Sequence, residues 1–174
     1  MEPITKLKNA PLVEAIFELR WRVKNNVQPP TIDPHYRILV GKFFEKLEDE
    51  YPIHQQLPTA EMPEAISEFV VQHRFRKKEN GWPLIQLGPG IITLNDTEDY
   101  EWTDFANRID RLLSLVFTIH PDKKNIEFLG LLLRYIDAYP FEFDKNDMFG
   151  FLNRKLKVKM EFPESLFIDS GVGK

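Results

Sequence analysis

The strict alternation of side-chain type between Pro11 and Val23 constrains the fold of this chain more than any other feature. Apolar side chains fill every second position, and charged side chains fill most of the positions between them. Successive side chains of a β-strand point to opposite faces of a sheet, so the pattern predicts a strand with one face on a core and the other largely in water. The apolar positions are Val13, Ala15, Phe17, Leu19, Trp21 and Val23, and the charged ones are Glu14, Glu18, Arg20 and Arg22.

The composition allows this strand to belong to a large core. The chain has 174 residues, of which 43% are hydrophobic, and it contains 14 Phe, 5 Tyr and 3 Trp. This apolar content excludes an intrinsically disordered chain. The lack of cysteine excludes disulfides, thiolate metal sites and a cysteine nucleophile. The net charge of −4 argues against generic binding to a phosphate backbone.

Two amphipathic helices are expected. The first begins at Asp33 and Pro34, which are typical of a helix N-cap and of the first helical position, and it ends before Pro52. The second runs from Trp102 to Phe117 and follows an acidic stretch that favours the positive end of a helix dipole. Both helices carry one apolar stripe and should therefore pack on the sheet.

Three further strands are expected at Glu68–Arg76, Trp82–Leu94 and Asn125–Tyr139. The second is interrupted at Gly88-Pro89-Gly90, which we interpret as a bulge or bend. The third is apolar on both faces and is expected at the centre of the sheet. The order strand, helix, strand, strand, helix, strand predicts an α+β fold of ferredoxin-like order, in which an antiparallel sheet carries two helices on one face.

The pattern divides the chain into a core domain, residues 1–140, and a C-terminal appendage, residues 141–174. In the appendage a short helix is expected from Met148 to Leu156, after Asp147 as its cap. Alternation from Leu156 to Phe162 indicates a further strand with a charged outer face. The appendage could be the start of a second part of a longer protein.

Four segments occur in the same order as in an uncharacterised, sporadically distributed family of bacterial proteins. They are Asn9–Glu18, with the sequence NAPLVEAIFE, then Leu87–Gly90 (LGPG), Tyr100–Trp102 (YEW) and Leu133–Asp137 (LRYID). The chain resembles this family from Lys8 to the last of these segments. The resemblance implies no established activity and supplies no functional residues. It also implies that members of the family are longer than this chain.

Catalytic and metal-binding patterns are not recognisable. The four histidines lack metal-ligand spacing, so we predict no metal site, no cofactor and no catalytic residues. The candidates for ligand binding are charged side chains of the predicted strands. They are Glu14, Arg20, Arg74, Arg76 and Arg134.

Three functions are open at this point. The leading hypothesis is a non-enzymatic interaction or ligand-binding module that binds a protein partner or forms a homo-oligomer through sheet edges or exposed aromatics. The alternative is nucleic-acid or anion binding by the basic strand from His73 to Lys78, which the acidic stretch Asn95–Asp104 disfavours. The third is an enzyme with a carboxylate-centred pocket around Glu14. We expect a cytoplasmic protein without a membrane span.

Overall fold

A computed structural model describes residues 10–24, 32–97, 100–159 and 161–163. The chain divides into two compact units, residues 1–138 and residues 139–174. No helix in the described ranges is long and apolar enough to cross a membrane.

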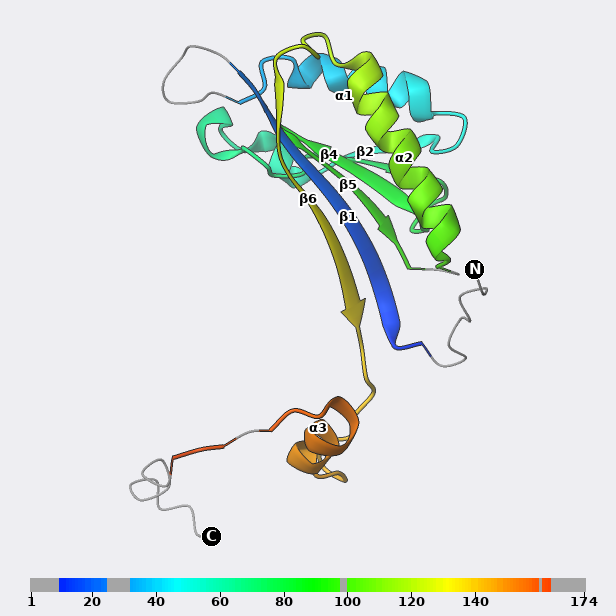
Figure 1. Ribbon diagram of the computed structural model, residues 1–174. Helices are drawn as coiled ribbons and strands as arrows, with labels where there is room; N and C mark the ends of the chain where they lie inside the picture. Colours follow the sequence, from blue (N-terminus) through cyan, green and yellow to red (C-terminus); the bar gives the residue numbers. More distant parts are fainter. Residues whose placement is uncertain (1–9, 25–31, 98–99, 160, 164–174) are drawn as a thin grey trace. The chain divides into compact units, whose positions relative to one another are not determined.

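The first unit is an α+β domain built on one antiparallel sheet. Six strands form it in the order β2-β3-β4-β5-β1-β6 (Figure 1). The strands are β1 (Leu12–Val23), β2 (Ile53–Gln56), β3 (His73–Arg76), β4 (Leu84–Gly88), β5 (Ile91–Asp96) and β6 (Ile126–Asp137). The predicted first strand is confirmed as β1, and every second side chain from Ala15 to Val23 is buried.

Two helices, α1 (Tyr36–Leu47) and α2 (Trp102–Ile119), pack on the same face of this sheet (Figure 1). Their apolar stripes meet the inner face of the strands, so that Phe43 of α1, Phe105 of α2 and Trp21 of β1 belong to one core. The opposite face of the sheet carries neither α1 nor α2 and is called the open face below.

The ferredoxin-like strand order is not confirmed, and Gly88-Pro89-Gly90 is not a bulge. These residues form the tight turn between β4 and β5, which pair antiparallel as a hairpin. Gly90 has a φ of 73°, a conformation that glycine adopts without steric cost. The predicted single strand is therefore two strands, and β2 adds a further one at the edge. The sheet has six strands because of these two differences.

The segment Asn125–Tyr139 was expected at the centre of the sheet, and this prediction is wrong. It forms β6, which pairs with β1 along one side and has no strand partner on the other among the described residues. Apolar side chains on both sides of a strand indicate that both faces become covered. They do not report whether strands pair with both of its edges, as in a central strand, or with only one.

The strand predicted at Glu68–Arg76 is shorter than expected. Only His73–Arg76 forms β3, and two short 3₁₀ helices, η1 (Pro58–Glu61) and η2 (Glu64–Ile66), precede it. Phe69 has a φ of 60°, which breaks the extended conformation and turns its side chain onto the open face.

The second unit contains helix α3 (Met148–Leu156), with the bounds that the sequence predicts. Phe141 and Phe151 pack together in it, with ring centroids 5.1 Å apart. Residues 157–159 and 161–163 form no strand, and Met160 of the predicted strand lies outside the described residues.

Candidate functional site

The five predicted ligand-binding residues all lie on the open face of the sheet. Directly opposed residues of antiparallel strands point to the same side, and the strand register therefore assigns each one. Arg134 is opposite Ile16, and Arg74 is opposite Gln86, which is itself opposite Thr93. None of these positions belongs to the helix-covered core. The five are Glu14 and Arg20 on β1, Arg74 and Arg76 on β3, and Arg134 on β6.

A chain of hydrogen bonds across four strands connects Glu14 to Arg74. Asn95 donates from Nδ2 to Oε1 of Glu14 at 2.8 Å, and Thr93 donates from Oγ1 to Oδ1 of Asn95 at 2.8 Å. Gln86 donates from Nε2 to both of these residues at 3.3 and 3.2 Å. The guanidinium of Arg74 donates to Oε1 of Gln86 at 3.1 and 2.9 Å. The two charged ends are therefore held in place by neutral side chains between them.

The other three residues do not join this network. Arg20 pairs with Glu18 at 2.6 Å, and Arg76 donates to the backbone oxygen of Gly81 at 3.1 Å. Arg134 lies on an exposed position of β6. The described cavities do not include Glu14, which gives no support to a carboxylate-centred enzyme pocket.

Arg20 is the one predicted residue that lines a described cavity, a shallow hollow of about 380 Å³ against β6. The ring of Phe69 lies beneath its guanidinium at 5.4 Å and beneath that of Arg22 at 5.5 Å. Arg22 also makes a bidentate ion pair with Glu68, in which its Nε and Nη2 lie 2.5 and 2.8 Å from the two carboxylate oxygens. These contacts attach the loop before β3 to the open face, and they occupy both arginines.

The open face offers little to a nucleic acid. Sheets that bind RNA stack bases on exposed aromatic side chains. The described strand positions of the open face carry no aromatic side chain.

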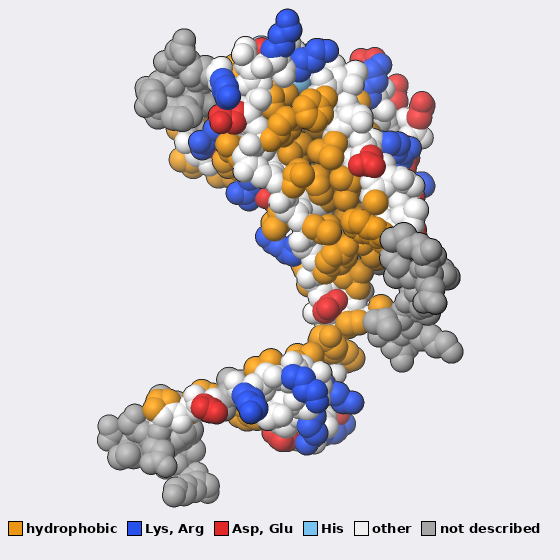
Figure 2. All heavy atoms as spheres, viewed as in Figure 1, with side chains coloured by type: hydrophobic (Ala, Val, Ile, Leu, Met, Phe, Trp, Pro, Cys, Tyr) orange, Lys and Arg blue, Asp and Glu red, His pale blue; other side chains and the backbone are white. Residues whose placement is uncertain are grey.

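Sequence reasoning missed an exposed apolar surface that runs along β6. Figure 2 shows a continuous band of apolar side chains over β6, β1 and the side of α2. Phe128 of β6 contacts Phe117 of α2, with ring centroids 4.8 Å apart, and the hydroxyl oxygens of Tyr100 and Tyr135 are 2.7 Å apart. The exposed apolar side chains of the strand are Phe128, Leu129, Leu131, Leu132, Leu133, Tyr135 and Ile136. The signal for this surface was the two-sided apolarity of the segment.

A buried polar cluster beneath β1 was also missed. The Asp33 carboxylate accepts hydrogen bonds from Trp21 Nε1 at 2.9 Å, from the backbone N–H of His35 at 2.9 Å and from His120 Nε2 at 2.8 Å. Burial by itself would raise the pKa of Asp33, but these hydrogen bonds outweigh it and lower the pKa. Because the side chains of Asp33 and His120 are fully buried, the cluster serves the structure and is closed to a substrate.

The geometry defines the class of the first unit. It is an α+β domain in which the edge strand β6 is apolar and most polar side chains of the open face hydrogen-bond or ion-pair with one another. No group of His, Asp or Glu within the described ranges is arranged to hold a metal ion. Comparison with known proteins finds no match to any family model, any curated protein or any solved structure.

Proposed function

We propose that this chain is a non-enzymatic interaction module that associates with a second copy of itself through the free edge of β6. The observation that carries the proposal is a strand edge that no described strand pairs with, combined with exposed apolar side chains on both sides of that strand. Free strand edges pair readily with further strands, and large apolar patches mark interaction sites.

The length of β6 favours a strand as its partner. It has 12 residues, so its free edge extends for about 40 Å. Natural edge strands are usually short, charged or interrupted by proline, because these features prevent pairing with other chains. Between Phe128 and Leu133 this strand contains no charged residue and no proline.

The two sides of β6 favour a partner that covers both faces of the sheet. Leu131 and Leu133 lie opposite Leu19 and Phe17 and point to the helix side, whereas Leu132 lies opposite Glu18 on the open face. A strand added beside β6 presents its own side chains to both sides and buries all three leucines. A second β6 supplies a partner of the same length and the same apolar character.

The mass of the full chain in solution, measured by sedimentation equilibrium over a wide concentration range, tests this proposal. The wild type should be a dimer that dissociates on dilution, and Leu131→Lys should be monomeric, because the lysine places a charge in the centre of the paired edge. The matched control is Ile66→Lys on η2, since Ile66 is 63% exposed and Leu131 is 64% exposed. Ile66→Lys should leave the dimer intact. A wild type that is monomeric at every concentration, or a dimer that survives Leu131→Lys, contradicts the proposal.

A further inference from the structure

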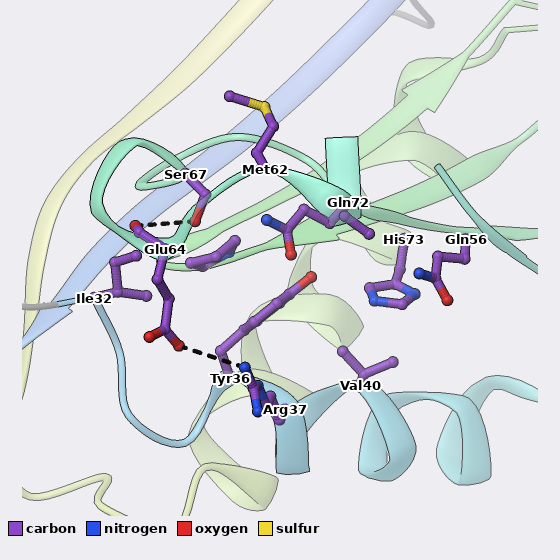
Figure 3. A pocket seen from close by; sticks show the side chains of 12 residues that line it. Ile32, Tyr36, Arg37, Val40, Gln56, Met62, Glu64, Ser67, Gln72 and His73 are labelled. Atoms are coloured by element: carbon purple, nitrogen blue, oxygen red, sulfur yellow. Dashed lines mark hydrogen bonds and ion pairs between the residues drawn. The ribbon is translucent and has the colours of Figure 1, made fainter. Parts of the chain in front are cut away.

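A cavity of about 340 Å³ lies between α1 and the segment that contains η1 and η2, away from β6. Figure 3 shows that the Tyr36 ring reaches from α1 into the middle of the side chains that line it. Apolar and uncharged polar side chains form most of the wall. The wall includes Tyr36, Gln56, Gln72 and His73, with Arg37 and Glu64 at the rim.

One hydroxyl in this wall is buried without a hydrogen-bond partner, and one side-chain amide makes no hydrogen bond among the described residues. Tyr36 is 8% exposed, and its hydroxyl has no partner. Gln72 is 6% exposed, and within the described residues only its backbone makes hydrogen bonds. Buried polar groups are almost always hydrogen-bonded, and an exception calls for an explanation such as a bound molecule. A ligand in the cavity can supply the acceptor and donor groups that the protein does not.

The charges at the cavity favour an uncharged ligand. Arg37 and Glu64 face each other at the rim at 3.9 Å, both largely exposed, so their charges offset one another. Burial, together with the neighbouring His54, lowers the pKa of His73, which keeps its imidazole neutral at physiological pH. Arg37 is the one Lys or Arg among the described residues lining the cavity, and a phosphate or carboxylate group therefore lacks an unpaired cation there.

The aromatic rings and the hydrogen-bonding groups in the wall favour a planar ligand. The rings of Tyr36 and His73 are 6.2 Å apart between centroids and provide aromatic surface. A glutamine amide carries a donor beside an acceptor, which is the pattern that pairs with the edge of a nucleobase. The volume lies at the small end of the range for ligand pockets, about 300–1,000 Å³, so a single heterocycle fits better than a nucleotide.

We propose that this cavity binds one small, neutral, planar heterocycle of the nucleobase class. In this arrangement the amide of Gln72 pairs with adjacent donor and acceptor atoms of the ring, and the Tyr36 hydroxyl donates to a second acceptor. The site lies on α1, β2 and the segment before β3, and it does not depend on association through β6.

Titration of the full chain with adenine, cytosine, uracil and hypoxanthine, followed by two-dimensional amide NMR and by calorimetry, tests this inference. At least one base should bind with a dissociation constant below about 1 mM. The amide shifts should centre on residues 32–40 and 56–73. Gln72→Met should weaken binding at least tenfold, and Tyr36→Phe should weaken it severalfold, since each removes hydrogen-bonding groups from the ligand.

The control variant is Gln55→Met, because Gln55 precedes Gln56 on β2 and points to the open face opposite Arg74. It should leave affinity unchanged. Glucose and adenosine monophosphate complete the set of probes. The inference is overturned if no base binds, which leaves water alone in the cavity, if Gln72→Met binds as the wild type does, or if only glucose or only the charged nucleotide binds. The oligomeric state plays no part in these outcomes, so failure here and failure of β6 pairing are distinguishable.

Discussion

His120 Nε2 lies 2.8 Å from Asp33 Oδ2, and both side chains are fully buried. The backbone N–H of Asp122 donates to His120 Nδ1 at 3.0 Å, so this nitrogen carries no proton. The imidazole proton is therefore on Nε2, which donates to Asp33. The loop before α1, the end of α2 and the Trp21 indole of β1 are joined in this way by one carboxylate.

Asp33→Asn should lower the free energy of unfolding by about 2–3 kcal/mol. Asp33 accepts from His35 at one oxygen and from Trp21 and His120 at the other. An amide in either orientation turns its NH₂ group toward a donor. Urea denaturation of both proteins measures the difference, with the exposed Asp110→Asn as a control that should change little. Equal stability of Asp33→Asn and wild type would show that the cluster contributes nothing.

The ionisation of Asp33 should make the free energy of unfolding depend on pH in the acidic range. Burial opposes ionisation of Asp33, but hydrogen bonds from His120, Trp21 and His35 outweigh it and hold its pKa below the ordinary 3.8. A carboxyl with a lowered pKa in the folded state stabilises the fold above its unfolded pKa, and this contribution is lost as the pH falls through the folded pKa. Below about pH 4 the wild type should lose stability more steeply than Asp33→Asn. Parallel pH profiles of the two proteins would contradict this.

The turn between β4 and β5 should not accept larger residues. A Cβ at Gly88 would lie 2.0 Å from the backbone oxygen of Val70, and one at Gly90 would lie 2.6 Å from that of Trp21. Backbone atoms cannot move aside cheaply, so each alanine variant should lose at least about 2 kcal/mol of unfolding free energy. Gly41→Ala on α1 is the matched control. A Cβ added at Gly41 would meet no neighbouring atom within 4 Å. This variant should therefore gain about 0.5–1 kcal/mol of unfolding free energy from the higher helix propensity of alanine. Thermal or urea unfolding of the three variants decides the point.

The sequence predicted those elements whose pattern depends on local periodicity. The alternation of β1 and the apolar stripes of α1 and α2 are found as expected, because a repeat of two or of 3.6 residues directly reports which side chains are buried. The position of β6 in the sheet was not predictable in this way. Its pattern reports that both faces are apolar, and it contains no information on which neighbour is present.

The candidate site was predicted in part for the same reason. Alternation places Glu14 and Arg20 on the same face of one strand, but the register that adds Arg74 and Arg134 to this face is a property of the sheet. The partners of Asp33 were hidden by distance along the chain, since His120 is 87 residues away. The sequence predicts Asp33 as an ordinary helix N-cap, whereas α1 begins at Tyr36 with His35 as its N-cap.

The stacked pair His54 and His73 should make stability fall between about pH 7 and pH 5. Their nitrogens Nε2 and Nδ1 are 2.9 Å apart, and this hydrogen bond requires one of them to be unprotonated. Burial lowers the pKa of both from the ordinary 6.5, and for His73 the charge of His54 adds to the effect. A histidine with a lowered folded pKa destabilises the fold once the pH falls below its unfolded pKa. The double variant His54→Gln, His73→Gln should have a flatter profile in urea denaturation at several pH values, and an unchanged slope would refute this.

Two buried tyrosines should respond in opposite ways to the loss of their hydroxyl groups. Tyr36 has a hydroxyl without a partner, whereas the hydroxyl of Tyr51 accepts from Arg108 Nη1 at 2.9 Å. Tyr36→Phe removes a buried, unsatisfied group and should raise the free energy of unfolding of the ligand-free protein by about 1 kcal/mol. Tyr51→Phe removes a satisfied group, leaves the charged donor one acceptor short and should lower it by about 1–2 kcal/mol. Both changes delete the same single oxygen atom from a buried ring, so the difference between them isolates the hydrogen bond. Urea denaturation without ligand measures both, and a loss of stability in Tyr36→Phe would mean that its hydroxyl is satisfied in solution, by water or by a rearranged neighbour.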